Sequence, residues 1–302
     1  MEIITDEQIR ALNITPEKSI EWVKESFLLK DRSVLKPKIS LCPRGSDFFN
    51  TMPCILPEEY HTYGVKVVSR IKGNKPSLKS KLFLFDTLSG EMTAMMDADW
   101  ITSMRTGAVA ALAIKTLRKN EAQVYALMGL GNIGHYVMDC LVTTFPKDRN
   151  VKVKLLKYKD QAEKFVDYYS EYENISFEVV DDVDTFIRDS DVVISCITQT
   201  DELIEPNVNL FKPGCLVVPV HTRGFQNCDL VFDKVYGDDT NHISGFKYFD
   251  RFRNFAEISS VLHGKTEGRS NNSERILSYN IGLGLHDAVF GYNIMKLLLH
   301  NK

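Results

Sequence analysis

The sequence predicts an α/β protein built from two kinds of domain. From about residue 122 to residue 220, strand-like and helical segments alternate, which is typical of a parallel sheet covered by helices. Residues 63–97, in contrast, contain consecutive strand-like segments without a helix between them. The C-terminal residues 273–300 again have helical periodicity. We therefore expect a parallel α/β domain inserted into an α+β domain.

The composition limits the class of protein. The chain has 302 residues, 44% of them hydrophobic, which suffices for the cores of about two domains. Its 37 basic and 40 acidic residues give a net charge of −3 without long single-sign blocks, so neither nucleic acid nor an anionic membrane is expected as a partner. No apolar run reaches the ~18 residues of a membrane span, and the acidic N-terminus does not resemble a signal peptide. We expect a soluble, cytoplasmic protein that acts on a small molecule.

The cysteines do not form a recognisable site. No CxxC pair and no nearby histidine at metal-ligand spacing accompanies them, so we expect reduced, mostly buried thiols and no bound metal. The six residues are Cys42, Cys54, Cys140, Cys196, Cys215 and Cys228.

The N-terminal region predicts a small α+β domain. Residues 16–30 carry apolar side chains at helical spacing after a proline in the first-turn position. Strand-like segments follow at 63–74, 81–87 and 90–97, the last two joined by a turn, so we expect a meander or hairpin sheet. The Ala-rich residues 101–117 predict a helix that leads out of this domain.

The inserted domain is expected to span residues 118–275, which leaves 1–117 and 276–302 for a substrate-binding and dimerisation domain. The expected strands are at 123–128, 151–156, 176–180, 191–198 and 215–220. The expected helices are at 134–145, 160–172 and around 182–190. The tail at 273–300 is expected to be helical and to pack on the first domain.

A glycine-rich turn, GLGNIG, joins the first strand of the inserted domain to its first helix. Gly129 permits the tight turn, Gly131 lets the backbone approach a pyrophosphate, and Gly134 lets the helix pack close to the strand. The helix N-terminus would present its N–H groups to the phosphates. The alternative is a tight turn that binds nothing, but the βα units that follow favour a Rossmann dinucleotide-binding domain. Asn132 and Ile133 in this turn, and Thr198 at the end of the strand at 191–198, are expected to contact the cofactor.

The end of the second strand indicates which nicotinamide cofactor binds. NAD-binding domains carry an Asp or Glu there, which bonds the adenosine ribose. This chain instead has Lys157, Tyr158 and Lys159 after Leu156. Two ammonium groups suit a 2′-phosphate, so we expect NADP(H) to be preferred and NAD(H) to be possible. The alternative is that the lysines are solvated surface residues, or that Asp160 accepts the ribose if the strand ends later.

Several segments resemble one known family. The segment DADWITSMRTGAVAALAIKTL, just ahead of the glycine turn, resembles the helix signature of the ornithine cyclodeaminase/μ-crystallin family. So do NTMPCILPEEYHTYGVKVVS, KLFLFDTLSGEMTAMMD, the glycine turn and LHGKTEGRSNNSERILSYNIGLGLHD, in the order of the family. The resemblance spans about residues 16–298. It implies a homodimer formed through the N-terminal domains. It also implies NAD(P)-linked hydride chemistry, because the family contains cyclodeaminases, ketimine reductases, an alanine dehydrogenase and opine-type dehydrogenases.

The resemblance also implies roles for individual residues. Lys66 matches the active-site lysine of the family, and Arg105 matches the arginine that binds the substrate carboxylate. Both roles are chemically reasonable, since a guanidinium binds a carboxylate through a planar fork and an enclosed lysine can exchange protons. Thr106 matches a position near the cofactor phosphates.

The chain departs from the family at two places. Where the family has a further carboxylate-binding arginine, Lys38 is the nearest match and Arg44 is a possible substitute. Where cyclodeaminases carry an Asp at the reacting carbon, this chain has Arg223, with His221 and Thr222 beside it. Arg223 would favour a second anionic group on the substrate, and His221 is either an acid/base or structural. Alternatively, the loop has another geometry and none of these residues faces the substrate.

Together these observations predict an oxidoreductase. We expect hydride transfer between NAD(P)H and the carbon that bears nitrogen in an α-imino or α-amino acid. Redox-neutral cyclodeamination of an ornithine-type substrate is the alternative within the family. The alternative that is not an enzyme is a binding protein of the same family that keeps the cofactor site but has lost the chemistry. Gly282 and Gly284 are expected to serve helix packing rather than to form a second phosphate loop, and Asp229 to end the loop that contains Arg223.

Overall fold

Two β-sheets organise the chain, one in each of its two units. The computed structural model describes residues 1–197, 200–220 and 223–300. Residues 1–105 and 282–302 form the first unit, and residues 106–281 form the second. The expected fold class, a parallel Rossmann sheet inserted into an α+β domain, is confirmed. The expected inserted domain spans residues 118–275, whereas the second unit begins at Thr106, inside the helix that starts at Asp99, and ends at Ile281.

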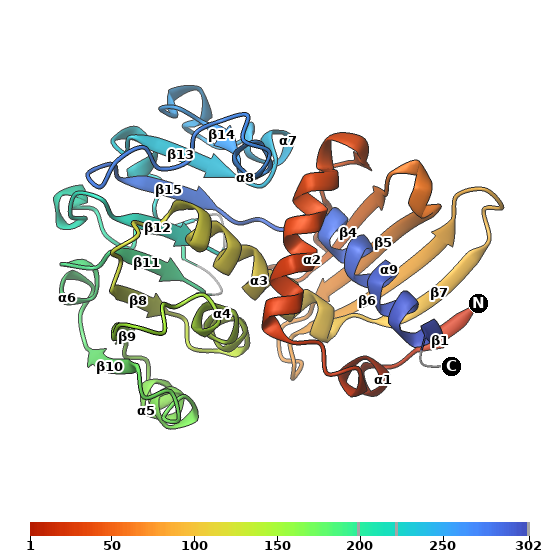
Figure 1. Cartoon of the computed structure of the whole chain (residues 1–302), viewed down its shortest axis with the longest axis horizontal. Helices are drawn as coiled ribbons and strands as arrows, with labels where there is room; N and C mark the ends of the chain where they lie inside the picture. Colours follow the sequence, from red (N-terminus) through yellow and green to blue (C-terminus); the bar gives the residue numbers. More distant parts are fainter. Residues whose placement is uncertain (198–199, 221–222, 301–302) are drawn as a thin grey trace. The chain divides into compact units, whose positions relative to one another are not determined.

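The first unit contains a seven-stranded sheet, seen in Figure 1 beside the N- and C-termini. Its strands are β1 (Glu2–Ile4), β2 (Val34–Leu35), β3 (Ile39–Leu41), β4 (Phe48–Ile55), β5 (Thr62–Arg70), β6 (Leu78–Asp86) and β7 (Met92–Asp97). Its helices are α1 (Asp6–Ala11), α2 (Pro16–Leu29), η1 (Lys30–Arg32), η2 (Glu58–Tyr60) and α9 (Gly284–His300), and α3 (Asp99–Leu117) begins in it. The helix expected at 16–30 and the three strands expected between 63 and 97 are present.

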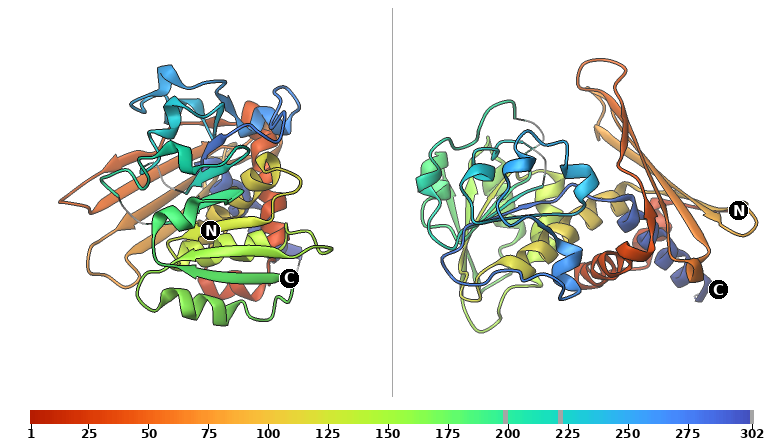
Figure 2. Two further views of the ribbon diagram at one scale, coloured as in Figure 1. Left: turned by 90° about the vertical axis from the view of Figure 1, so that its left-hand side faces the viewer. Right: turned by 90° about the horizontal axis from the view of Figure 1, so that it is seen from above.

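The strands of this sheet run in the order β1-β7-β6-β5-β4-β2, with β3 also paired to β4. Helices α2 and α9 lie on one face of it, as the right view of Figure 2 shows. Alternate residues of β6, such as Leu82 and Leu84, are buried on this face. Close approach of α9 needs small residues: a Cβ at Gly64 would stand 2.8 Å from the Cβ of Ala288.

The opposite face of the same sheet carries many apolar side chains. Residues of odd number on β4, β5 and β6 point to it, because the even-numbered residues are the buried ones. Several of its side chains are exposed, including Phe49 at 44% and Leu41 at 67%. We refer to this surface as the open face, formed by Val34, Ile39, Leu41, Phe49, Ile55, Tyr63, Val65, Phe83 and Phe85.

The second unit contains an eight-stranded parallel sheet. Its strands are β8 (Val124–Met128), β9 (Val151–Leu156), β10 (Ile175–Val180), β11 (Val192–Ser195), β12 (Leu216–Pro219), β13 (Lys234–Gly237), β14 (Ala256–Glu257) and β15 (Ile276–Tyr279). Its helices are α4 (Asn132–Val142), α5 (Gln161–Tyr168), α6 (Val183–Ile187), η3 (Val208–Leu210), η4 (Cys228–Leu230), α7 (Thr240–Ile243), η5 (Phe249–Arg251) and α8 (Ile258–Leu262).

The strand order of this sheet is β10-β9-β8-β11-β12-β15-β13-β14. The order reverses between β8 and β11, and in open α/β sheets ligands bind at the carboxyl ends of the strands where such a reversal occurs. The turn after β8 is the glycine turn predicted to bind the cofactor. All five strands predicted in this region are present.

The prediction for the tail was wrong at its start. Residues 276–279 form β15 between β12 and β13, and the helix begins only at Gly284. The four residues of β15 are all buried, and a short buried apolar run cannot be assigned to helix or strand by its periodicity. Gly282, with φ of +79°, separates the strand from α9.

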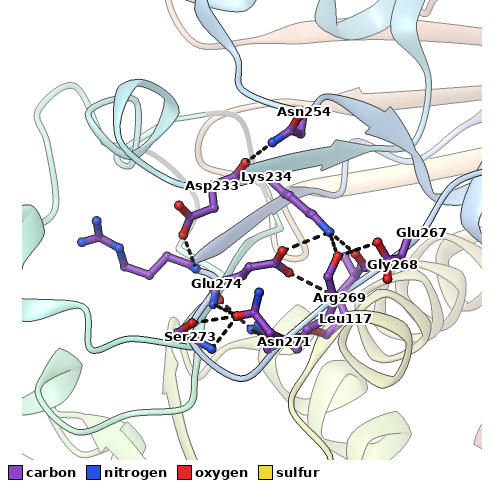
Figure 3. A network of polar contacts seen from close by, with 12 residues as sticks. Leu117, Asp233, Lys234, Asn254, Glu267, Gly268, Arg269, Asn271, Ser273 and Glu274 are labelled. Carbon is purple, nitrogen blue, oxygen red and sulfur yellow. Dashed lines mark hydrogen bonds and ion pairs between the residues drawn. The ribbon is translucent and has the colours of Figure 1, made fainter.

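The loop before β15 ties the end of α3 to the sheet, as Figure 3 shows. The Nε atom of Arg269 donates a hydrogen bond of 2.7 Å to the carbonyl of Leu117, the last residue of α3. Its Nη1 atom donates to the carbonyl of Glu274, and the carboxylate of Glu274 pairs with Lys234 at 3.2 Å. In the second unit, Arg269, which belongs to the segment LHGKTEGRSNNSERILSYNIGLGLHD, therefore caps the C-terminal end of α3.

Candidate functional site

Three ionisable side chains are buried together in the first unit. Lys66 lies on β5 and points to the face of the sheet that α9 covers. Its Nζ atom is 2.8 Å from the Oδ1 atom of Asp287, in the first turn of α9. The Nε atom of Arg105, on α3, is 3.2 Å from the same oxygen. Lys66 and Asp287 are completely buried and Arg105 is 6% exposed. We call these three residues the cation cluster.

The backbone ahead of α9 shapes this cluster. A Cβ atom at Gly282 would collide with the Nη1 atom of Arg105. A Cβ atom at Gly284 would stand 2.7 Å from the carbonyl oxygen of Met52 on β4. Gly282 therefore makes room for the guanidinium, and Gly284 permits the close approach of α9 to the sheet.

Burial changes the acidity of Lys66. It lowers the pKa of the ammonium from 10.5 to about 7, and the positive charge of Arg105 acts in the same direction. The carboxylate of Asp287 opposes the change, whereas Lys38 contributes to it. An amine with a pKa near neutrality can take up and release a proton under physiological conditions.

The two candidates for a further carboxylate ligand differ in their surroundings. Lys38 lies close enough to Lys66 for its charge to affect the pKa of that lysine. Arg44 has a side chain that is 80% exposed, and its Nε atom pairs with Asp47 at 2.9 Å. In the first unit, Lys38 rather than Arg44 is therefore associated with the cation cluster.

Two further residues lie beside Lys66, and no motif in the sequence points to them. Asp287 is one, and its neighbour His286 is the other. The Nδ1 atom of His286 is 2.6 Å from the hydroxyl of Ser26 on α2, and its burial holds the pKa of the imidazole well below the usual range. His286 is therefore neutral at physiological pH. Both residues belong to the motif GLGLHD, but nothing in that motif shows what its side chains contact.

The glycine turn in the second unit has the geometry of a phosphate-binding loop. Gly129 has φ of +81°, and a Cβ there would collide with the backbone of Cys196 after β11. A Cβ at Gly134 would collide with the carbonyl oxygen of Gly129. A Cβ at Gly131, in contrast, would meet no heavy atom within 4 Å. The structure thus has open space at the position where the backbone is expected to approach a pyrophosphate.

The end of α4 that faces this turn also suits a dinucleotide. Gly131 is the N-cap of α4 and has no side chain that could cap the first N–H groups of the helix. Asn132 is exposed and Ile133 is partly buried. Thr106 precedes Gly107, whose Cβ would collide with the carbonyl of Tyr136 on α4, so Thr106 lies beside that helix. The cofactor contacts expected of Thr106, Asn132 and Ile133 stay predictions.

Three expected cofactor residues follow β9, next to β8 in the sheet. Lys157 lies 3.7 Å from Asp181, with about half of its side chain exposed. The ammonium of Lys159 is 5.2 Å from the ring centre of Tyr158, which is 60% exposed. Asp160, the alternative ribose ligand, pairs with Lys164 at 2.6 Å.

The loop that departs from the family pattern is described only in part. His221, Thr222 and the expected cofactor contact Thr198 lie outside the described residues. Arg223 is exposed and its Nη1 atom is 3.3 Å from Asp201. The described residues contain no group of three or more His, Cys, Asp or Glu side chains that could hold a metal ion. They also include no helix long and apolar enough to cross a membrane.

Comparisons with known proteins agree with the resemblance seen in the sequence. The profile of the ornithine cyclodeaminase/mu-crystallin family matches residues 5–297. The chain is 28% identical to the nodulation efficiency protein NfeD of Rhizobium meliloti, over 86% of this chain and 83% of that protein. It is 25% identical to the N-((2S)-2-amino-2-carboxyethyl)-L-glutamate dehydrogenase of Staphylococcus aureus, over 87% and 83% of the two chains.

Solved structures with this fold include the Delta(1)-pyrroline-2-carboxylate reductase of Thermococcus litoralis in complex with NADH and L-proline. Its TM-score is 0.85 at 22% identity, and the superposition covers 100% of this chain and 98% of that chain. At this identity, the similarity establishes a common fold.

Proposed function

Because this chain belongs to the ornithine cyclodeaminase/mu-crystallin family, we propose that it is an NAD(P)H-dependent oxidoreductase of α-imino and α-amino acids. It reduces a C=N bond next to a carboxylate, or oxidises the corresponding amine. The cation cluster supports this proposal most strongly. It combines a fork-shaped cation for a carboxylate with an amine whose pKa lies near 7.

In this proposal, Arg105 binds the carboxylate of the substrate. Its planar guanidinium suits a carboxylate better than an ammonium does, because it can donate two parallel hydrogen bonds. Burial at 6% exposure removes competing water and strengthens this charge-assisted contact. Lys38 adds a second positive charge near Lys66. Arg105 and Lys38 together would orient the carboxylate and leave the adjacent carbon to react.

Lys66 handles the proton that the reaction consumes. Reduction of an imine adds one hydride to carbon and one proton to nitrogen. The glycine turn and α4 would hold a nicotinamide cofactor, which would supply the hydride. The ammonium of Lys66 donates the proton, and the neutral amine accepts it in the reverse direction. A pKa of about 7 makes both forms of Lys66 available near neutral pH.

The finer properties of the cofactor and assembly are also proposals. We propose that NADP(H) is preferred, because Lys157 and Lys159 follow the strand end where a 2′-phosphate is expected. We propose that the chain forms a homodimer through the open face, because contiguous exposed apolar surfaces usually serve as interfaces. The family resemblance supports the same assembly.

The proposed activity can be tested with a panel of substrates. Purified protein is mixed with NADPH or NADH and with cyclic ketimines or pyruvate plus an amine, and nicotinamide absorbance is followed. The reverse reaction uses oxidised cofactor with ornithine or opine-like conjugates. We expect cofactor turnover with at least one imine, and we expect Lys66→Ala to abolish it. Equal rates in the Lys66→Ala variant, or no turnover with any compound, would contradict the proposal.

A further inference from the structure

Asp287 contacts both candidate catalytic cations, and the mechanism above does not use it. Its Oδ1 atom accepts hydrogen bonds from Lys66 at 2.8 Å and from Arg105 at 3.2 Å. The side chains of Lys66 and Asp287 are both 0% exposed. The single oxygen therefore joins two residues that the strand β5 and the helix α3 supply separately.

We propose that Asp287 is a positioning residue, which favours the charged form of Lys66 and holds Lys66 and Arg105 at a fixed separation. The catalytic meaning of this role rests on the proposed function. The contacts themselves do not, since they join side chains of this chain alone.

The charges around Lys66 show why a carboxylate is needed. Arg105 from α3 and Lys38 from the segment between β2 and β3 are cations, and both favour loss of the proton from Lys66. His286, next to Asp287 on α9, is neutral, and burial raises the pKa of the Cys54 thiol on β4 to about 12, so that it is also uncharged. Of the three charged side chains that act most strongly on Lys66, only Asp287 is an anion.

The second carboxylate oxygen argues against a purely structural role. The Oδ2 atom of Asp287 is buried and makes no hydrogen bond within the described chain. A structural carboxylate normally has both oxygens satisfied, as Asp191 does with Lys119, Lys212 and two backbone N–H groups. Asp287 accepts hydrogen bonds only at the oxygen that Lys66 and Arg105 share. Its orientation is therefore coupled to these two cations.

The test measures the protonation of Lys66 directly. Protein with 13C at the lysine Cε position is titrated by NMR, and the Lys66 resonance is assigned as the one missing in Lys66→Ala. In the wild type, we expect the midpoint near pH 7. In Asp287→Asn, the midpoint should fall by about one to three pH units, because an opposite charge at this distance shifts a pKa by that amount. Arg105→Gln should raise the midpoint, since it removes a cation.

A matched control is Asp191→Asn in the second unit. It also replaces a buried carboxylate that pairs with two cations, and its effect on the Lys66 midpoint should be zero. Equal Lys66 midpoints in the wild type and Asp287→Asn would overturn the proposal. Asp287→Ser removes the same charge with a smaller side chain and carries the same expectation. If neither Asp287 variant folds while Asp191→Asn does, Asp287 is needed for the fold and the proposal is also overturned.

A second readout links the charge to catalysis. Reduction needs the ammonium form of Lys66, so kcat/KM should decline as pH rises through the Lys66 midpoint. In Asp287→Asn this decline should move to lower pH together with the NMR midpoint, whereas a merely destabilised protein would lose activity without a change in the profile. If Lys66 titrates as described but the wild type reduces no imine, the proposed function fails and the positioning role remains. If the midpoint moves but the pH profile does not, Asp287 does not act through Lys66 in catalysis.

Discussion

Lys66 is a buried amine, and burial determines the chemistry available to it. In water a lysine stays charged up to about pH 10, whereas Lys66 has a pKa of about 7 because burial and the charge of Arg105 both disfavour its ammonium form. Asp287 limits that effect through a hydrogen bond of 2.8 Å. Burial and Arg105 lower the pKa and Asp287 raises it, so both forms of the amine are accessible near neutral pH, as an acid/base group requires.

A second buried carboxyl allows a test of electrostatics without catalysis. Asp229 is 1% exposed, and its Oδ1 atom accepts a hydrogen bond of 2.7 Å from the hydroxyl of Tyr279. Burial raises the pKa of Asp229 to about 7, although the hydrogen bond from Tyr279 opposes this. The folded state therefore binds a proton that the unfolded state releases above about pH 4. The unfolding free energy of the wild type therefore falls as pH rises from about 4 to about 7, because unfolding then releases the proton of Asp229.

We expect Asp229→Asn to remove this dependence, because an amide keeps the contact with Tyr279 and does not titrate. The unfolding free energy of the variant, relative to the wild type, should rise by about 2–3 kcal/mol between pH 5 and pH 8. Urea unfolding at the two pH values measures it. As a control, Asp191→Asn should be destabilised equally at both, because hydrogen bonds hold the pKa of Asp191 at about 2 despite its burial. A constant Asp229→Asn difference would show that Asp229 is charged in the fold.

The sequence predicted Lys66 and Arg105 but not their partner. The two residues were found because their surroundings resemble family motifs. Asp287 was not found because it is 221 positions from Lys66 in the chain, and no local pattern encodes a contact between them. The same applies to Asp229 and Tyr279, which meet only because η4 and β15 lie close in the folded second unit.

At the scale of elements, the glycine turn between β8 and α4 is the best-predicted part of the chain. A local reason predicted each of its three glycines. In the structure, Gly129 and Gly134 lie against backbone atoms, and Gly131 faces open space. The short elements β13, α7, β14 and α8 were not predicted, because they lack the continuous apolar runs that predicted the equally short strands β11 and β12. β15 was assigned to a helix because the periodicity of so short a run does not distinguish helix from strand.

Gly131 and Gly134 form a matched pair for testing the turn. Gly131→Val places its side chain in open space, so stability should change little, but NADPH affinity should fall at least about tenfold, or ~1.4 kcal/mol. Gly134→Ala places a Cβ against the carbonyl of Gly129 and should cost roughly 1–3 kcal/mol of stability. Fluorescence titration with NADPH and thermal unfolding measure the two effects. Wild-type affinity in folded Gly131→Val would remove the cofactor assignment.

The end of β9 carries the prediction for cofactor preference. Replacing Lys157 and Lys159 together with glutamine should weaken NADPH binding by about ten- to a hundredfold, since charge-assisted contacts contribute roughly 1.5–3 kcal/mol. NADH binding should be unchanged. Lys164→Gln on α5, which removes a nearby lysine paired with Asp160, is the control and should affect neither. Calorimetric titration would refute the preference if the wild type bound NADH as tightly as NADPH.

At the scale of the whole molecule, the two units carry separate parts of the proposed function. The first holds the cation cluster and the open face, and the second holds the glycine turn. Both sheets could be anticipated from the alternation of segments along the chain, because strand and helix periodicity is a local property. The packing of the tail helix on the first domain was predicted, but its contact with β5 in particular depends on residues distant in sequence, which no local pattern encodes.

The open face provides a prediction about assembly. Phe49→Glu adds a charge to this apolar surface and should convert the dimer into a monomer, which sedimentation or light scattering would detect. Tyr168→Glu, on α5 of the second unit, replaces an exposed aromatic residue outside the open face and should remain dimeric. A dimeric Phe49→Glu variant, or a monomeric wild type, would exclude the open face as the dimer interface.

Net hydride transfer to an imine is tested most directly by the stoichiometry of cofactor and ammonia. The family resemblance places Arg223 where cyclodeaminases carry an Asp, and an arginine cannot accept a proton because its pKa stays above ~12. With an imine substrate, we therefore expect one reduced cofactor to be consumed for each amine formed. With ornithine and catalytic NAD⁺, we expect negligible ammonia. Ammonia and proline appearing together from ornithine, without a net change in nicotinamide absorbance, would contradict the account.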